Sequence, residues 1–336
     1  MKVPKWMREL ECFFEIKDTL IFEGNIYDEY PVIIDVSQDP GPAEPAGFKN
    51  LNEYITAFVH SRGYRICFYD FVNGFLGLNK DILDIFRDFM ENMKEEASYT
   101  GEKSADDRTD TLHQMIAGYE ELQEAERNKE KGEAFESDRG LECPLEMAPE
   151  VIKLLITKNE TPTVVCMNFA SRVLADPARM SEKERLFFSQ LLYAGLKARK
   201  TRCEDKVIRQ NHLFMIADKI NDIPTWFYLD NPNVKDIHIA IPDRHVREMY
   251  VDFYREFFAS DEADEKELDH FIEITEDMKV LDLRGIRELK RNPDMRASKI
   301  ADIVALYKYG IKENPWDGIE RERLEHAEEK IKERVK

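Results

Sequence analysis

The sequence contains no long hydrophobic run. None of its apolar stretches approaches the ~20 residues that a membrane-spanning helix needs. Its first residues, MKVPKWMRELECFF, also lack the apolar core and the small-residue cleavage site of a secretory signal peptide. Neither a membrane helix nor a cleaved leader is therefore expected, and the cytoplasm is the expected compartment.

Cysteine and histidine are scarce and widely spaced. The chain has seven histidines, none at metal-ligand spacing, and five cysteines. The cysteines are Cys12, Cys67, Cys143, Cys166 and Cys203. An odd number of cysteines, far apart and mostly inside apolar runs, is typical of free thiols in a reducing compartment. The sequence therefore predicts neither disulfides nor a metal site.

Basic residues are fewer than acidic ones. With 49 Lys and Arg against 68 Asp and Glu, the formal net charge is −19. Such an acidic surface repels phosphate backbones and anionic lipids, so neither nonspecific nucleic-acid binding nor membrane-surface binding is expected. A local basic stretch at 197–202 is interpreted as a solvated helix end. No Ser/His/Asp or Cys/His arrangement singles out a nucleophile, so no catalytic residue is predicted.

Helical and extended patterns alternate over most of the first 242 residues. Asn50 is a predicted N-cap, and Ser181 with Glu184 forms a predicted capping box. Helices are expected over about 1–15, 51–62, 151–156 and from 181, and strands over 19–22, 64–69, 162–169, 212–217 and 234–241. Short apolar strands that alternate with helices favour an α/β fold, with a parallel sheet and flanking helices.

The segment of about 79–150 interrupts this alternation. Apolar residues at helical spacing mark one helix over 82–89 and another over 112–122. Residues 94–108 and 124–139 are highly charged and almost free of apolar side chains. We interpret the segment as a helical insertion with exposed or mobile links.

After Pro242 the pattern is helical throughout. Helices are expected over 243–258, 264–274, 282–289 and 298–309, and they would form a small bundle. A last charged helix carries only a narrow apolar stripe and is interpreted as a connector. The expected domains are an α/β core over 1–242, a helical subdomain over 243–310 and a connector helix over 311–336.

Three strings of the sequence resemble the AAA+ ATPase family. The string HLFMIADKINDIPTWFYLDNPNVKDIHIAIPDRHVREMYVDFY is similar to the fourth strand, the loop after it, the fifth strand and the entry to the lid of an AAA+ module. VVCMNFA resembles the strand that carries the Walker B motif, and LDLRGIRELKR resembles a lid helix. The resemblance covers about 15–310 and implies a P-loop-NTPase-like sheet with 243–310 as a helical lid.

The resemblance also implies candidate nucleotide contacts. Asp218 falls where the family places its polar sensor residue, with Asn221 as a near alternative, and Arg287 matches the arginine of the lid helix. Gly24 and Asn25 follow the first strand and could form a vestigial anion cradle. Plainer interpretations exist for all five and are favoured. Asp, Asn and Gly suit turns, and Arg287 suits a surface arginine paired with a nearby carboxylate.

The chain departs from the family at the residues that bind and cleave ATP. A P-loop needs Gly-x-x-x-x-Gly-Lys-Ser/Thr, because its backbone N–H groups, lysine and hydroxyl hold the phosphates and magnesium. Residues 23–30 have one glycine, no lysine and three acidic side chains. Asn168 stands where the family has a magnesium-organising aspartate, and Phe169 where it has the glutamate that activates water. Asn168 stays a weak candidate contact, but no hydrolysis and no cofactor are expected.

A candidate pore loop follows the second strand. Substrate-threading members of the family have an aromatic–hydrophobic–glycine loop at this place, and the chain has Phe75-Leu76-Gly77. The alternative is a glycine-containing strand exit with Phe75 in the core, and it is the interpretation that we favour.

The leading hypothesis is a degenerate AAA+ module that acts as an assembly or regulatory scaffold, associating with its own copies or with other AAA+ modules. One alternative is a module that binds ATP and magnesium through nonstandard contacts. Another is a protein-interaction domain that recruits a partner through 79–150. The last residues, IKERVK, resemble the helix that leads into a Clp-type ATPase module, so a second module is expected downstream.

Overall fold

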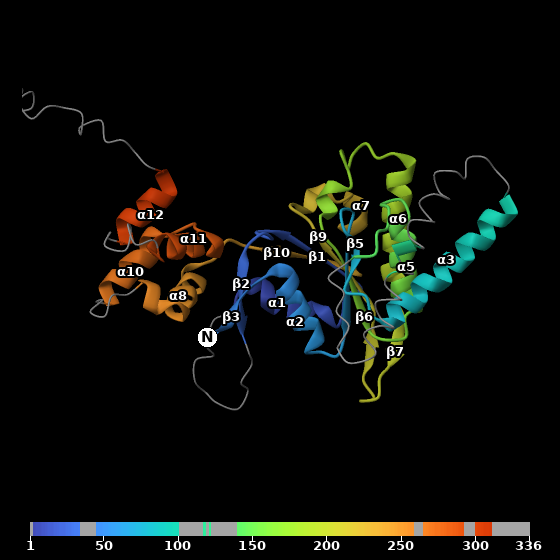
Figure 1. Cartoon of the computed structure of the whole chain (residues 1–336), viewed down its shortest axis with the longest axis horizontal. Coiled ribbons are helices and arrows are strands. Elements are labelled where there is room, and N and C mark those ends of the chain that lie inside the picture. The colour runs from blue at the N-terminus through green and yellow to red at the C-terminus, as the bar shows by residue number, and fades with distance from the viewer. Residues whose placement is uncertain are drawn as a thin grey trace, which may run out of the picture. The chain divides into compact units, whose positions relative to one another are not determined.

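The computed structural model of the chain (Figure 1) describes residues 3–33, 45–100, 117–118, 121, 140–258, 265–291 and 300–310. The chain divides into two compact units. One is formed by 1–43 and 48–241, and the other by 44–47 and 242–336. The six-stranded sheet belongs to the first unit, and the helices that follow Pro242 belong to the second.

The centre of the first unit is a sheet with the strand order β10-β1-β9-β6-β4-β5. Its strands are β1 (Thr19–Gly24), β4 (Arg65–Asp70), β5 (Gly74–Leu76), β6 (Thr163–Met167), β9 (His212–Ile216) and β10 (Val234–Ile239). All neighbouring pairs are parallel except β4 and β5. Phe22 of β1 is in register with Ile216 of β9 and Ile237 of β10. The parallel strands therefore end along one edge of the sheet.

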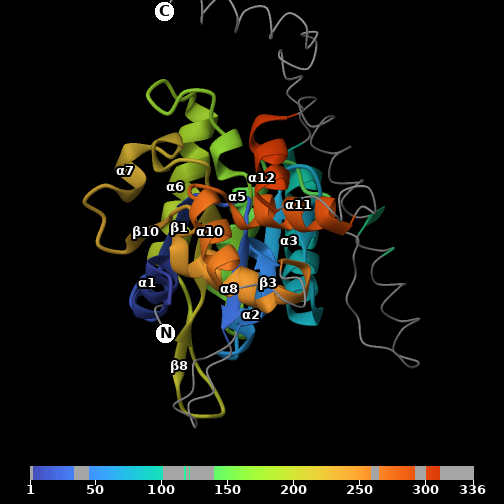
Figure 2. The same cartoon turned by 90° about the vertical axis from the view of Figure 1, so that its left-hand side faces the viewer.

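Helices cover both faces of this sheet (Figures 1 and 2). One face carries α1 (Lys5–Phe14) and α2 (Leu51–His60), and the other carries α3 (Lys80–Thr100), α5 (Ala148–Lys158), α6 (Glu182–Leu196) and α7 (Thr225–Tyr228). Successive strand residues point to opposite faces, so Val165 packs with the second set of helices and Cys166 with the first. Strands β6 and β9 are buried along their whole length, as expected of strands covered on both faces.

Local hydrogen bonds explain where several helices begin. At the start of α2, Glu53 N donates to Asn50 Oδ1 at 2.9 Å. At the start of α6, Ser181 N donates to Glu184 Oε2 at 2.7 Å, and Glu184 N donates to Ser181 Oγ at 3.3 Å. Pro149 lies in the first turn of α5, where a missing N–H breaks no helical hydrogen bond. Both predicted caps are confirmed.

Smaller elements surround the main sheet. Two short two-stranded sheets pair β2 (Glu29–Ile33) with β3 (Pro45–Asn50), and β7 (Lys200–Arg202) with β8 (Ile208–Gln210). Short 3₁₀ turns at Ala170–Arg172 and Ile220–Asp222 follow β6 and β9. These turns place polar side chains at the edge where the parallel strands end.

The part of the second unit that follows Pro242 consists of helices where it is described. Its helices are α8 (Arg244–Phe253), α9 (Arg255–Phe258), α10 (Glu265–Ile274), α11 (Val280–Arg291) and α12 (Ile300–Tyr309). Asp243 caps α8, because its Oδ1 accepts a hydrogen bond from Val246 N at 2.9 Å. Phe271, Leu283 and Ile286 are fully buried in this unit. Apolar packing of amphipathic faces therefore holds the helices together.

The predicted fold class is confirmed: the chain is an α/β protein whose mostly parallel sheet is flanked by helices. One expectation is wrong. Helix α3 continues through Thr100, so 94–100 are helical and not a link. Lys, Glu and Ala extend a helix without an apolar face, which explains the difference. The rest of the charged stretches 94–108 and 124–139, most of the expected helix 112–122 and the connector 311–336 lie outside the described residues.

The five cysteines are all free. Cys67, Cys143 and Cys166 are buried, and burial raises the pKa of each of these thiols. Cys12 is exposed and Cys203 is partly buried. In the part of the chain that the structure describes, no helix is both long and apolar enough to cross a bilayer.

Candidate functional site

Most of the predicted nucleotide contacts lie at the edge where the parallel strands end. Open α/β sheets bind their ligands at this edge. Gly24 ends β1, Asn168 follows β6, and Asp218 follows the neighbouring strand β9. Asn25 comes directly after Gly24, and Asn221 lies in the 3₁₀ turn beyond Asp218. The structure therefore brings the residues of three strand ends to one side of the sheet.

Gly24 is required by backbone packing. Its φ is +96°, and a Cβ at this position would lie 2.6 Å from Ile239 O. Gly24 N donates to Asp218 O at 3.2 Å. Asn25 N donates to Ile239 O at 2.8 Å, and Ile26 N donates to Gly24 O at 2.9 Å. A phosphate cradle needs free N–H groups, and these three successive N–H groups are already bonded to carbonyls of the chain.

Asp28 stabilises the same turn from within. Its buried carboxylate accepts hydrogen bonds from Asn25 Nδ2 at 2.8 Å and from Glu29 N at 2.9 Å. The Tyr30 hydroxyl donates to Asn25 O, and burial, followed by the charge of Asp28, raises the pKa of Tyr30. Strand β2 begins at Glu29, so β1 is followed by a strand and not by a helix. The turn offers a phosphate neither a lysine nor a helix N-terminus.

Asp218 is bonded through both carboxylate oxygens. The Tyr27 hydroxyl donates to Oδ1 at 2.7 Å, and Arg172 Nη2 lies 2.6 Å from Oδ2. Its backbone N donates to Ser171 Oγ at 2.6 Å. Burial, and then the hydrogen bond and charge of Asp218, raise the pKa of Tyr27. Tyr27, Ser171 and Arg172 thus tie the ends of β1, β6 and β9 together.

Sequence reasoning missed Tyr27, Ser171 and Arg172. All three lie within a few residues of a strand end, Tyr27 after β1 and the other two after β6. That position was the available signal, because side chains that follow parallel strands gather at one edge. Their mutual contacts with Asp218 could not be predicted from spacing in the sequence.

Asn168 and Phe169, the two residues directly after β6, carry no carboxylate. Asn168 is largely buried, and its backbone N donates to Tyr69 O at 2.8 Å. Phe169 has a left-handed backbone with φ of 55°, and 37% of the residue is exposed. Its ring centroid lies 6.3 Å from that of Phe71. Among the described residues, no group of three or more His, Cys, Asp and Glu side chains could hold a metal ion.

Arg287 belongs to α11 in the second unit, and it is buried and not on the surface as the plainer interpretation expected. Its guanidinium lies 4.0 Å from the Tyr254 ring centroid and 5.7 Å from that of Phe257. Its Nη2 lies 3.0 Å from Glu288 Oε1, so the expected carboxylate partner is present. The aromatic rings explain the burial, because they cover the cation while keeping an electrostatic attraction to it.

Phe75 of the candidate pore loop is fully buried. Its ring centroid lies 4.7 Å from that of Tyr69 and 5.0 Å from that of Phe86. Leu76 is in register with Phe68 of β4, and Gly77 has a φ of +76°. This placement is the one expected of a strand exit that packs into the core, and not of an exposed loop.

Comparison with known proteins identifies the family of the chain. No curated protein matches the chain in sequence. Among solved structures, the crystal structure of the FIGL-1 AAA domain in complex with ADP is similar with a TM-score of 0.32 and 12% identity, over 56% of this chain and 63% of that chain. Residues 1–240 match the family described as the AAA+ chaperone, N-terminal Rossmann-like domain. Because the match spans well over half of its 336 residues, the chain belongs to this AAA+ chaperone family.

Proposed function

We propose that this chain is a structural module of an AAA+ chaperone, which supplies an assembly interface and neither binds nor hydrolyses ATP in the manner of a P-loop. The observation that carries the proposal is the turn after β1. The N–H groups of Gly24, Asn25 and Ile26 are all bonded to carbonyls of the chain, and the turn leads into a strand. A triphosphate has no cradle to enter.

The energetics of the turn support this proposal. To bind phosphate, Gly24 N and Asn25 N would have to leave Asp218 O and Ile239 O. A buried carbonyl left without its partner costs about 1–3 kcal/mol. The buried carboxylate of Asp28 adds repulsion toward an anionic ligand at the same place. Both effects oppose nucleotide binding before any chemistry takes place.

The ends of β6 and β9 support it as well. Asp218, the candidate sensor, already has Tyr27 and Arg172 as partners. Asn168 and Phe169 cannot supply a carboxylate for magnesium or for a proton. The residue that would contact a nucleotide in an active module, Asp218, here bonds to Tyr27 and Arg172 and so helps to hold three strand ends together.

The remaining function is assembly. The chain belongs to an AAA+ chaperone family, and in this role it would contribute contacts to its own copies or to active AAA+ modules. In this role the closed carboxyl edge stabilises the module in the absence of nucleotide. The charged surface and net charge of −19 keep the free module from nonspecific association.

Titration calorimetry of the purified chain with ATP and Mg²⁺ tests the proposal. We expect no saturable heat of binding at ligand concentrations up to about 1 mM. A Kd of about 1 mM corresponds to a binding free energy of about −4 kcal/mol. Sedimentation velocity over a range of protein concentrations tests self-association in the same samples. Saturable binding that requires magnesium would instead favour a module that holds ATP through nonstandard contacts.

A further inference from the structure

Helix α6 is apolar on two sides. Its inner side, with Phe187, Phe188 and Leu191, is buried against the sheet. Its outer side exposes Leu186 by 58% and Tyr193 by 52%. No described residue buries these two outer side chains, so the outer side of α6 is a candidate contact surface.

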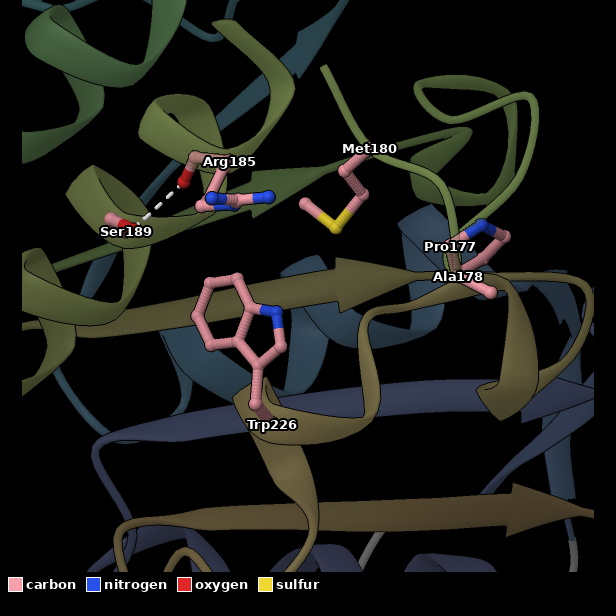
Figure 3. A pocket seen from close by; sticks show the side chains of 6 residues that line it. All are labelled: Pro177, Ala178, Met180, Arg185, Ser189 and Trp226. Carbon is pink, nitrogen blue, oxygen red and sulfur yellow. Dashed lines mark hydrogen bonds between the residues drawn. The ribbon is translucent and has the colours of Figure 1, made fainter. Parts of the chain in front are cut away.

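Three adjoining hollows lie along this outer side. A hollow of about 630 Å³ is lined by residues of α5 and α6, and it shares Ser189 with a hollow of about 520 Å³ beside Trp226. Figure 3 shows the second of these, with the Trp226 ring pointing toward Met180 and Arg185. A third, of about 750 Å³, shares Leu186 with the first. Exposed Trp, Tyr, Met and Arg side chains are enriched where proteins bind one another.

The charge of the hollow between α5 and α6 is opposite to that of the chain. Its lining includes Lys153, Lys158 and Lys197 and no carboxylate. Glu150 lies beside it and is 3.5 Å from Lys153, which leaves an excess of positive charge. In a chain with a net charge of −19, this groove would attract an acidic partner.

The shape of the groove favours a helix as its occupant. Its α6 wall runs from Leu186 to Lys197, with lining residues one turn apart. At 1.5 Å per residue this wall is about 16 Å long, or about three helical turns. Rows of side chains on two packed helices form a trough that accepts the ridge of a third helix. An extended peptide would find no strand edge here to pair with.

We propose that the groove between α5 and α6 binds one amphipathic helix of a partner protein, which presents an apolar stripe flanked by Asp or Glu side chains. The apolar stripe packs on Leu154, Leu186 and Tyr193, and the flanking carboxylates face Lys158 and Lys197. This interaction does not depend on whether the chain binds ATP, so it can fail or hold independently of the proposed function.

A stapled helical peptide of about four turns, roughly 14 residues, is the probe. It carries Leu on one face and Glu on both flanks, and a matched peptide carries Lys in place of every Glu. Fluorescence anisotropy with the full chain measures binding of each. We expect the Glu peptide to bind at least about tenfold more tightly than the Lys peptide, and added salt to reduce the difference.

Three variants of the full chain locate the binding site. Leu186→Glu is expected to remove most of the binding, and Lys158→Glu to weaken the Glu peptide while strengthening the Lys peptide. Ile16→Glu is the matched control, because Ile16 is 65% exposed and lies next to α1 on the opposite side of the sheet. All three sites are exposed, so the variants should fold.

Two results would overturn the proposal. The first is the absence of selective binding, which means either that neither peptide binds or that both bind equally and Leu186→Glu leaves both affinities unchanged. The other is that the chain forms dimers in sedimentation and Leu186→Glu dissociates them, because the groove would then hold a second copy of this chain. Both results would leave the ATP-binding measurement unaffected.

Discussion

The Tyr27 hydroxyl donates a hydrogen bond to Asp218 Oδ1 at 2.7 Å, although 191 residues separate the two in sequence. Arg172 lies 2.6 Å from the second carboxylate oxygen. These contacts occupy the edge of the sheet at which an active module of this fold would read a nucleotide. They link the residues that follow β1, β6 and β9 to one another.

Tyr27 in the β1–β2 turn and Tyr30 at the start of β2 should contribute unequally to stability. Tyr27 is 52% exposed, so Tyr27→Phe should lower the free energy of unfolding by at most about 1 kcal/mol. Tyr30 is buried and donates to Asn25 O, so Tyr30→Phe should cost about 1–3 kcal/mol. Urea unfolding of both variants measures the difference. A larger loss from Tyr27→Phe than from Tyr30→Phe would contradict the described turn.

Gly24 should tolerate a side chain less well than another glycine with positive φ. Gly24→Ala places a Cβ 2.6 Å from Ile239 O, which would push β10 from β1. Gly63 has a φ of +78°, but its Cβ would meet only the Arg209 side chain at 3.5 Å. Gly63→Ala should therefore cost only the left-handed backbone penalty of about 1–2 kcal/mol, and Gly24→Ala distinctly more. Equal losses of unfolding free energy in the two variants, measured by urea unfolding, would contradict the close approach of Gly24 to Ile239 O.

Much of the fold could be predicted because its signals are local. Strands β6 and β9 are short apolar runs between turn residues, and the caps of α2 and α6 are hydrogen bonds within three residues. The missing lysine between β1 and β2 also identified the departure from a P-loop. Each of these features depends on neighbours in sequence.

The remaining features depend on tertiary contacts. The contacts of Tyr27 and Ser171 with Asp218 join residues that are 191 and 47 positions apart in the sequence. Arg287 is buried because Tyr254, from another part of the second unit, lies over its guanidinium. A charged helix with an arginine has the same sequence pattern whether that arginine is exposed or covered.

His212 should make stability depend on pH. Burial lowers the pKa of His212 to about 4, from the 6.5 of an ordinary histidine, and Nδ1 donates to Lys17 O at 3.0 Å. Below pH 6.5 His212 is protonated in the unfolded chain, whereas in the folded chain it stays neutral until the pH is near 4. The contribution of the neutral His212 to the free energy of unfolding is therefore fully present above pH 6.5 and is lost as the pH drops. Between pH 7 and pH 5 the loss should be about 2 kcal/mol.

The comparison of variants isolates this effect. His212→Gln should remove the contribution of His212 to the slope of unfolding free energy against pH, whatever its effect on stability at pH 7. His60→Gln is the control, because His60 is exposed at the end of α2. Urea unfolding of the variants at several pH values measures the slopes. An unchanged slope in His212→Gln would contradict the burial of a neutral ring.

Arg287 should stabilise the second unit and not bind nucleotide. Arg287→Lys removes the planar cation over Tyr254 and should weaken local stability by about 1–2 kcal/mol. Hydrogen exchange should therefore become faster in α11 and unchanged in β6. Arg284→Lys, at an exposed position of the same helix, should change neither. Unaltered exchange in Arg287→Lys would show that the aromatic contact contributes little.

The most direct test of the central claim is phosphate release from ATP in the presence of Mg²⁺. It should be measured for the purified chain and for the double variant Asn168→Asp, Phe169→Glu, which restores both carboxylates after β6. The account predicts release no faster than a buffer blank for either protein, because the N–H groups after β1 remain bonded to Asp218 O and Ile239 O. Magnesium-dependent release that scales with the concentration of either protein would contradict it.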